Sequence, residues 1–223
     1  MTHSAAALAH ALDTPAGAPW GGLVILHGAG SRKENHADMG AAAAAAGLAA
    51  VRFDMRGHGD TGGRLDGRAL DDVAAAAALL PAGLPLALRG SSMGGYVALA
   101  AAARACAAAV WAVCPAPASL LGRGLRTGEL EVEADADALA ALLAAHPLDA
   151  VLDALEIPVL IQHAEGDERV PVAGSRALAR HLRHPASRVE FAPGGDHRSV
   201  QHDPAAQAAG LAWLRSVLAP ASR

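Results

Sequence analysis

The sequence predicts an α/β protein in which helices cover both faces of a mostly parallel β-sheet. Short apolar runs alternate along the chain with longer, alanine-rich runs of helical spacing, and this alternation is typical of parallel strands joined by helices. Hydrophobic residues make up 52% of the chain and charged residues 18%, which supports a large buried core. Because only three Trp, two Phe and one Tyr are present, we expect Ala, Leu and Val to build that core and small residues to line any pocket in it.

The predicted elements follow one another in a regular order. Buried strands are predicted at residues 23–26, 50–53, 84–88, 109–113, 158–161 and 189–192. Helices are predicted at residues 36–46, 69–80, 93–105, 136–145, 173–182 and 204–218. Turn residues separate them, as in Pro81-Ala82-Gly83 and Pro193-Gly194-Gly195. Since the segment before residue 23 is short, any strands in it are expected to be short, irregular or missing, and the sheet to have about six to eight strands.

The domain organisation predicted from the length is simple. A chain of 223 residues lies within the range that an α/β fold covers as one unit, so residues 1–223 are expected to form a single domain. One connection, residues 115–156, is longer than the others and carries an acidic patch from Glu129 to Asp137. We expect this insert to act as a minimal cap. Its acidic patch could disfavour anionic substrates, but a solvated helix start is the simpler interpretation.

Charge and patterning exclude several classes of partner. The net charge of -4 and the scattered Arg residues leave no basic stripe for nucleic acid. The N-terminal segment 1–15 lacks a positive region and has no uninterrupted apolar run, so we expect no signal peptide. No apolar run is long enough for a membrane span, and the expected location is cytoplasmic. In that compartment Cys106 and Cys114 are expected to be reduced, buried thiols rather than a disulfide.

The strongest functional pattern is Gly90-Ser91-Ser92-Met93-Gly94, which lies directly between a predicted strand and a predicted helix. A nucleophile on such a sharp turn needs residues without side-chain bulk two positions before and after it, because the backbone folds back on itself. Glycines occupy both positions around Ser92, whereas Ser91 would have Arg89 and Met93 there. Ser92 is therefore the predicted nucleophile. The N-terminus of the following helix favours the negative charge that develops beside it.

With this motif, the chain from Leu23 onward resembles the α/β-hydrolase family. That family places an oxyanion loop after an early strand, and here an apolar run leads into His27-Gly28-Ala29-Gly30. The resemblance implies that the backbone N–H groups of Ala29 and Met93 form the oxyanion hole, with Gly30 as the alternative to Ala29. His27 is expected to be a structural residue of this loop.

A second stretch, Asp54-Met55-Arg56-Gly57-His58-Gly59-Asp60-Thr61, is similar to the family's D-x-R-G-x-G-x-S turn, with Thr in place of Ser. It identifies the family rather than a catalytic group. His58 is expected to form local hydrogen bonds in this loop, and a substrate contact is the less favoured role.

A serine hydroxyl needs a base within hydrogen-bond reach, and the base needs a carboxylate that fixes its tautomer. In this family the chain order is serine, acid, histidine. His163-Ala164-Glu165-Gly166-Asp167 follows a predicted strand and resembles the family's acid loop, with Ala164 where Gly is usual, so Asp167 is the predicted acid and Glu165 the alternative. Pro193-Gly194-Gly195-Asp196-His197 matches the family's base loop, which makes His197 the predicted base. Asp196 is expected to be solvated.

Metal and nucleotide sites are not expected. The eleven histidines include no H-E-x-x-H motif, and the two cysteines lack ligand spacing. The sequence Gly28-Ala29-Gly30 is not followed by the third glycine of a dinucleotide loop. The resemblance likewise implies no cofactor.

The reaction implied is acyl transfer from an ester to water through an acyl-enzyme on Ser92. Among family members the chain looks most like small bacterial carboxylesterases and the dienelactone-hydrolase-like or serine-aminopeptidase-like proteins. True dienelactone hydrolases use cysteine, so that activity is disfavoured. The expected partner is a small, soluble, short-chain ester. A thioesterase, a C–C bond hydrolase or an amide hydrolase would use the same triad, and a binding module without catalysis would usually have lost part of it.

Overall fold

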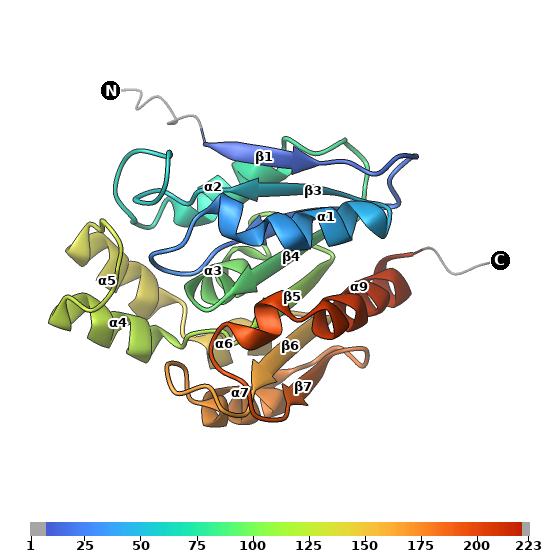
Figure 1. The fold of residues 1–223 in the computed structure, drawn as a ribbon. Helices are drawn as coiled ribbons and strands as arrows, with labels where there is room; N and C mark the ends of the chain where they lie inside the picture. The colour runs from blue at the N-terminus through green and yellow to red at the C-terminus, as the bar shows by residue number, and fades with distance from the viewer. Residues whose placement is uncertain (1–7, 220–223) are drawn as a thin grey trace.

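The computed structural model describes residues 8–219 and contains one seven-stranded sheet with helices on both faces (Figure 1). The strands are β1 (His10–Asp13), β2 (Gly21–Leu26), β3 (Leu48–Phe53), β4 (Leu86–Ser91), β5 (Ala109–Val113), β6 (Val159–Ala164) and β7 (Arg188–Ala192). The fold class and the strand number are confirmed. Part of the N-terminal segment expected to lack a signal peptide, residues 1–7, lies outside the described residues.

The strand order β1-β3-β2-β4-β5-β6-β7 explains where a site can form. All neighbouring pairs are parallel except β1, which pairs antiparallel with β3. From β2 the chain moves first to β3 on one side and later to β4 on the other. The connections that leave the carboxyl ends of the neighbouring strands β2 and β4 therefore run in opposite directions. Open α/β sheets bind their ligands at such a topological switch point.

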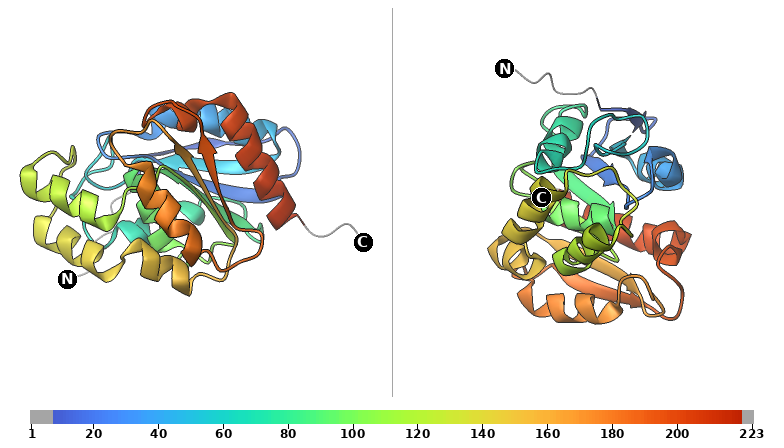
Figure 2. Two further views of the ribbon diagram at one scale, coloured as in Figure 1. Left: turned by 90° about the horizontal axis from the view of Figure 1, so that it is seen from below. Right: turned by 90° about the vertical axis from the view of Figure 1, so that its left-hand side faces the viewer.

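Helices cover the two faces of the sheet in two layers, visible in both views of Figure 2. On one face lie α1 (Ala37–Ala45) and α9 (Pro204–Leu218), which pack against an apolar cluster around Leu23, Ile25 and Trp111. The other face is covered by α2 (Ala69–Ala77), α3 (Met93–Ala101), α6 (Leu148–Ala154) and α7 (Val172–Leu178). Each of the six predicted strands and six predicted helices overlaps an element of the structure.

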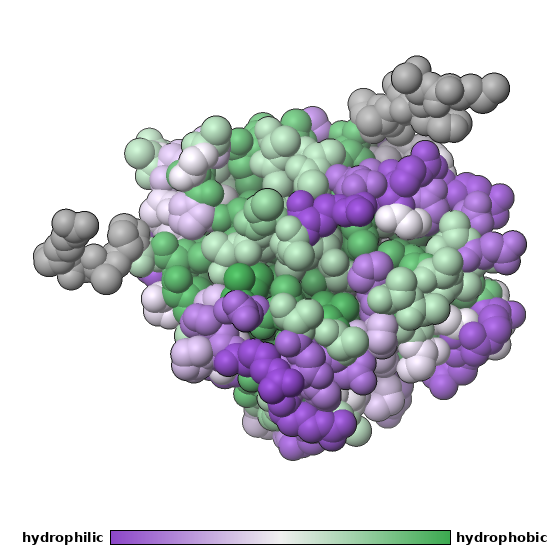
Figure 3. Space-filling view, turned by 180° about the vertical axis from the view of Figure 1, so that it is seen from behind, coloured by the Kyte–Doolittle hydropathy of each residue, from purple (hydrophilic) through white to green (hydrophobic). Residues whose placement is uncertain are grey.

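The alanine-rich composition allows close contact between helices and sheet. At Gly210 of α9, an added Cβ would lie only 2.2 Å from the Trp111 ring of β5, so helix and strand touch through a glycine. The surface reflects the same composition. Figure 3 shows a broad apolar area on the face that α2 and α3 cover, and within residues 8–219 the only exposed large hydrophobic residues are Leu12 and Leu79.

Several boundaries differ from the predictions for local reasons. β4 begins at Leu86 and continues to Ser91, later than the predicted 84–88, because Gly90 and Ser91 still pair with Ala112 and Val113 of β5. α1 starts at Ala37 after a 3₁₀ turn, Lys33–His36, and a second 3₁₀ turn, Ala179–His181, ends α7. Before residue 23, where any strand was expected to be short, irregular or missing, the structure has the short strand β1, while the short helix α8 (Ser199–His202) was not predicted.

The insert 115–156 contains more helix than predicted. Besides α5 (Ala136–Ala145) it holds α4 (Ala118–Thr127), which begins after Pro117 and ends at Gly128 in the left-handed conformation. Gly122 and Gly124 lie inside α4, in a stretch where no helix was predicted. Figure 1 shows α4 and α5 together beyond the carboxyl ends of the parallel strands, whereas α6 packs against α3. Only the first two helices are therefore placed to cover a site.

The helices and the two cysteines test two further predictions. No helix within residues 8–219 combines the length and the apolar character that crossing a bilayer requires. Cys106 and Cys114 are both free thiols, as predicted, but only Cys114 is buried. The prediction for Cys106 was wrong because this residue lies in the turn after α3, with a φ of 52°, rather than on the helix itself.

Candidate active site

Ser92 lies on the sharp turn between β4 and α3. Its backbone has a φ of 55° and a ψ of -120°, a conformation that residues other than glycine rarely adopt. The turn is held by hydrogen bonds on both sides of the residue. The Ser92 N–H donates to the Val113 carbonyl at 2.9 Å, and the Ser92 carbonyl accepts from Tyr96 and Ala116, each at 3.1 Å.

The two glycines flanking Ser92 are required by the backbone, as predicted from their spacing. A Cβ on Gly90 would lie 2.1 Å from the Gly94 carbonyl oxygen. A Cβ on Gly94 would lie 2.4 Å from the His27 carbonyl oxygen. Both distances are far shorter than a van der Waals contact, so only glycine lets β4, α3 and the loop after β2 approach one another here.

The loop after β2 brings Ala29 to the same place. A Cβ on Gly28 would lie 3.3 Å from the Cβ of Ser92, so the loop passes directly over the serine. The His27 Nδ1–H donates to the Gly28 carbonyl at 2.8 Å, and the ring's Nε2 accepts from the Met55 N–H at 3.0 Å. Burial lowers the pKa of His27 to about 4, so the ring is neutral at pH 7 and can make both bonds. Because the Gly28 carbonyl and the Ala29 N–H share one peptide group, His27 fixes the direction of that N–H.

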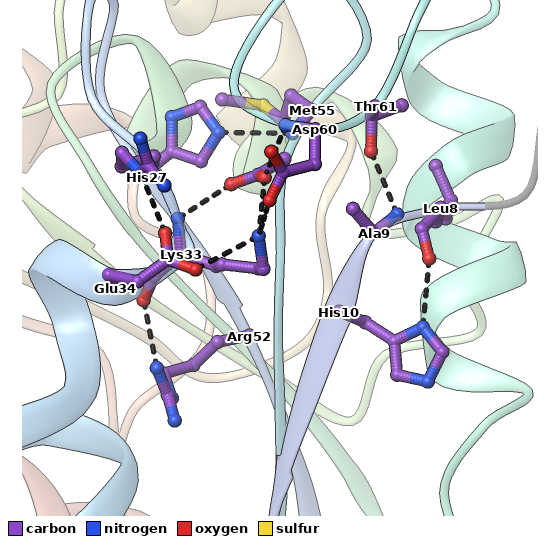
Figure 4. Close-up of polar contacts among 12 residues, drawn as sticks. Leu8, Ala9, His10, His27, Lys33, Glu34, Arg52, Met55, Asp60 and Thr61 are labelled. Atoms are coloured by element: carbon purple, nitrogen blue, oxygen red, sulfur yellow. Dashed lines mark hydrogen bonds and ion pairs between the residues drawn. The ribbon is translucent and has the colours of Figure 1, made fainter.

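The far end of this loop is anchored to the turn after β3 (Figure 4). Asp54 is fully buried and accepts from the Lys33 N–H at 2.7 Å and from Lys33 Nζ at 2.8 Å, and Lys33 Nζ also contacts Asp60 at 2.7 Å. Burial opposes ionisation of Asp54, but the hydrogen bonds from Lys33 outweigh it and lower the pKa of the carboxyl. Thr61, in the position where the family has Ser, accepts from the Ala9 N–H. His58 bonds only locally, to the Arg56 carbonyl, as expected.

Asp167 and His197 meet at the carboxyl ends of β6 and β7. His197 Nδ1 lies 2.7 Å from Asp167 Oδ2, while Asp167 Oδ1 accepts from the N–H groups of Arg169 and Val170 at 2.9 and 2.8 Å. Burial opposes ionisation of Asp167, but hydrogen bonds from His163, His197 and Val170 hold its pKa well below the usual range. The alternative acid, Glu165, is exposed and forms an ion pair with Arg176 instead. The neighbouring Asp196 is exposed, as expected, and accepts from backbone N–H groups at the start of α8.

Three further residues contact Asp167 or lie beside it, and the sequence analysis missed them. His163 Nε2 lies 3.3 Å from Asp167 Oδ2, and Ser175 Oγ lies 2.7 Å from His163 Nδ1. The thiol of Cys114 belongs to a cluster with Asp167 and His197 whose potential ligand atoms all lie within 4.8 Å of one another. The four-residue spacing of His163 and Asp167 around a strand end was the signal available, but only the fold shows that Cys114 lies beside this carboxylate and that Ser175 contacts His163.

Ser92, Ala29 and His197 line one cavity of about 560 Å³. The apolar part of its wall is formed by Leu120 and Leu121 of α4 and by Leu130, which follows this helix. Charged side chains also line this cavity, namely those of Arg123, Glu129, Glu131, Arg169 and Arg198. Two members of the acidic patch therefore face the site rather than only solvent. Small residues account for part of the wall, as predicted, but leucine and arginine account for much of the rest.

Several solved structures are similar to this chain over nearly its whole length. Est1E from Butyrivibrio proteoclasticus, solved with ferulic acid bound, has a TM-score of 0.79 at 22% identity and covers 96% of both chains. The monoacylglycerol lipase of Paleococcus ferrophilus has a TM-score of 0.75 at 18% identity, covering 94% of this chain and 98% of its own. A thermophilic esterase from Thermogutta terrifontis reaches 0.70 at 22% identity, covering 95% and 94%. At these identities the likeness shows the fold.

Family membership comes from the sequence itself. No curated protein sequence matches the chain. The family model described as serine aminopeptidase S33, Hydrolase_4, matches residues 17–144, which is more than half of the 223 residues. The matched segment includes the loop after β2, the Asp54 turn and the Ser92 turn. The chain therefore belongs to this serine aminopeptidase family of α/β hydrolases.

Proposed function

We propose that this protein hydrolyses carboxylic esters through a Ser92–His197–Asp167 triad and an acyl-enzyme intermediate. The observation that carries the proposal is that Ser92, on its strained strand-to-helix turn, opens into the same cavity as His197, whose Nδ1 is bonded to buried Asp167. An acid that holds one ring nitrogen leaves the other nitrogen free to act as the base. This arrangement supports the roles of nucleophile, base and orienting acid.

In the proposed reaction His197 Nε2 takes the hydroxyl proton as Ser92 Oγ attacks the ester carbonyl carbon. The tetrahedral intermediate then collapses, and His197 returns the proton to the departing alkoxide, releasing the alcohol. Water attacks the acyl-enzyme in the same way, with His197 again as base, and the acid leaves. Ionised Asp167 stabilises the imidazolium formed in each half of the reaction.

We propose the backbone N–H groups of Ala29 and Met93 as the oxyanion hole. Ala29 lines the cavity with Ser92, and His27 fixes the peptide that carries its N–H. Met93 is the first residue of α3 and its N–H belongs to the free N-terminal turn of that helix. Gly30 is less favoured because it has a φ of 66° and lies against the Glu131 carboxylate, which would repel an oxyanion.

The proposed substrates are small esters with short acyl chains. A cavity of about 560 Å³ lies within the range that holds small molecules, and the exposed charged residues on its wall limit the length of apolar chain it can bury. The similar structures named as an esterase, a monoacylglycerol lipase and an enzyme bound to ferulic acid favour ester chemistry over amide chemistry.

The test is hydrolysis of p-nitrophenyl esters from acetate to long acyl chains by the wild type, Ser92→Ala and Ser91→Ala. We expect the wild type to prefer short chains and Ser92→Ala to lose at least about 10⁴-fold in kcat. Ser91→Ala removes a neighbouring hydroxyl that is buried and has no hydrogen-bond partner among the described residues, so it should keep wild-type activity.

Two results would contradict the proposal. Full activity in Ser92→Ala would show that the nucleophile is another group. A folded wild type that cleaves none of the esters would move the search to acyl-CoA and amide substrates. The cytoplasmic location, the absence of a nucleic-acid partner and the single-domain organisation of residues 1–223 with a cap at 115–156 stay predictions.

A further inference from the structure

The carboxylate of Asp167 contacts a second histidine, and that histidine contacts a second serine. His163, at the end of β6, is fully buried and its Nε2 lies 2.9 Å from the Val170 carbonyl oxygen and 3.3 Å from Asp167 Oδ2. Its Nδ1 lies 2.7 Å from the hydroxyl oxygen of Ser175, which is 1% exposed in α7. Ser175, His163 and Asp167 thus repeat the residue types of the proposed triad around the same carboxylate.

These contacts determine which atoms carry protons. The Val170 carbonyl can only accept, so the Nε2 of His163 must carry the proton and donate it. The same N–H is shared with Asp167 Oδ2, which is the more distant of its two acceptors. In a neutral ring the Nδ1 is then an acceptor, which the Ser175 hydroxyl satisfies as donor. The Val170 carbonyl therefore selects the tautomer of His163 that can donate to Asp167, and the Ser175 hydroxyl stabilises that tautomer by donating to Nδ1. Neither residue lines the cavity of Ser92, so the pair has no access to substrate.

We propose that His163, held in one tautomer by the Val170 carbonyl and Ser175, is a positioning residue that fixes the Asp167 carboxylate and weakens the hydrogen bond from His197 to that carboxylate. The inference rests on the proposed function, because it concerns the acid of that triad. The titratable groups that face the carboxylate are His163 from β6, His197 from the loop after β7 and the Cys114 thiol from the segment after β5. Two backbone N–H groups complete its surroundings.

The direction of the effect follows from competition for one oxygen. His163 and His197 both approach Asp167 Oδ2, at 3.3 and 2.7 Å. A carboxylate oxygen that accepts two hydrogen bonds is a weaker acceptor for each than one that accepts a single bond. Removing the His163 donor should therefore strengthen the bond to His197, favour the protonated ring and move the acid limb of kcat/KM to higher pH. Loss of the lateral support should also lower kcat through misplacement of the base.

The experiment compares His163→Leu, His163→Gln, Ser175→Ala and the control Ser187→Ala in kcat, KM and the pH profile of kcat/KM for p-nitrophenyl acetate. We expect His163→Leu to lower kcat about tenfold to a hundredfold, to leave KM within about twofold, and to raise the midpoint of the acid limb. Ser175→Ala should shift the limb in the same direction by less. His163→Gln, whose amide can replace the Nε2–H donor, should restore most of the wild-type profile.

Ser187→Ala is the matched control because Ser187 Oγ accepts from the Val159 N–H at the other end of β6. It removes one hydroxyl that is hydrogen-bonded to this strand from the segment before β7, without approaching Asp167, so its acid limb should stay at the wild-type position. A folded His163→Leu variant with wild-type kcat and an unmoved limb would overturn the inference. An equal shift in Ser187→Ala would also overturn it, since the effect would then be general loosening of β6.

A second readout separates this inference from the proposed function. The His197 Nδ1 proton lies in a 2.7 Å bond to a carboxylate and should give a far-downfield proton NMR resonance in wild type. We expect that resonance to move further downfield in His163→Leu, where the bond strengthens, whether or not an ester is cleaved. An unchanged resonance in that variant would refute the role of His163, while absent ester cleavage with a shifted resonance would refute only the proposed activity.

Discussion

At the scale of single residues, the site depends on glycines, whose lack of a side chain lets backbone segments approach closely. The turn at Ser92 brings three backbone segments within contact distance, and a methyl group on Gly94 would lie 2.4 Å from the His27 carbonyl oxygen and 2.5 Å from that of Leu26. Neither oxygen can move away easily, because one belongs to the last residue of β2 and the other to the first residue of the loop that carries Ala29. The position of the proposed nucleophile relative to the proposed oxyanion loop is thus fixed by a glycine.

Gly94→Ala should therefore damage activity more than stability. We expect the added methyl to push α3 and the loop after β2 apart, costing about 1–3 kcal/mol in the free energy of unfolding and at least about 10²-fold in kcat. Urea denaturation and ester hydrolysis measure the two effects.

Gly174→Ala is the control for this substitution. Gly174 lies in α7, and a Cβ there has no heavy atom within 4 Å, so alanine should be neutral or stabilise by about 0.5–1 kcal/mol and leave kcat unchanged. If Gly94→Ala were equally harmless, close packing at the turn would not be what selects glycine.

At the scale of elements, periodicity predicted the strands and helices that bury a continuous apolar face, and failed where burial comes from pairing or tertiary contact. β5 was predicted because its residues are apolar throughout, and β6 because it begins with the apolar run Val159-Leu160-Ile161. β1 was not, because its residues alternate between exposed and half-buried and contain His10 and Asp13. α4 was not predicted because its two glycines, Gly122 and Gly124, disfavour a helix, yet Leu121 belongs to the core and also lines the cavity. The triad residues were found from turn chemistry that is local in sequence, whereas Ser175 and Cys114 needed the fold.

A substitution at the N-terminus of α5 tests how strongly this helix of the insert is stabilised. Asp135 is its N-cap, and the side chain accepts from the Ala138 N–H at 3.1 Å while the Asp135 N–H donates to the Leu65 carbonyl. Asp135→Ala should cost about 1 kcal/mol in the free energy of unfolding, because one N–H at the helix start loses its partner.

Asp137→Ala is the matched comparison on the same helix. Asp137 lies in the first turn and has no side-chain hydrogen bond within the described part of the chain, so its removal should cost only about 0.3 kcal/mol through the helix dipole. Urea unfolding curves of the two variants give both values. Equal losses would show that charge at the helix start, rather than capping, stabilises α5.

At the scale of the whole molecule, the buried titratable groups make the free energy of unfolding decrease as pH falls. Burial lowers the pKa of His27 to about 4 and lowers those of His36 and His58 as well. In the unfolded chain histidine titrates near 6.5. As pH falls below that value, the unfolded state binds protons that the folded state refuses, so stability present above about pH 6.5 is lost toward pH 4.

The buried carboxyls add a second loss at lower pH. Despite the opposing effect of burial, hydrogen bonds hold the pKa values of Asp54 and Asp167 below their unfolded values. Their contribution is complete above about pH 4 and disappears as pH falls through the folded values. As pH falls, protonation of the histidines therefore lowers the free energy of unfolding first, and protonation of the carboxyls lowers it further. The protein should unfold at a higher pH than repulsion between its positive charges alone would cause.

The histidine part can be isolated with a pair of substitutions measured by urea unfolding at pH 7.5 and pH 5.5. His58 is buried and its Nδ1 bonds the carbonyl two residues earlier, that of Arg56, while His10 is exposed and bonds the Leu8 carbonyl in the same way. We expect the wild type to lose stability between the two pH values, with His27 alone contributing about 1 kcal/mol. His58→Asn keeps an N–H donor but cannot titrate, so it should reduce the loss, whereas His10→Asn should not change it. If the wild type were equally stable at both pH values, the buried histidines would have to be protonated in the fold, and the neutral His27 that orients the Ala29 N–H would be excluded.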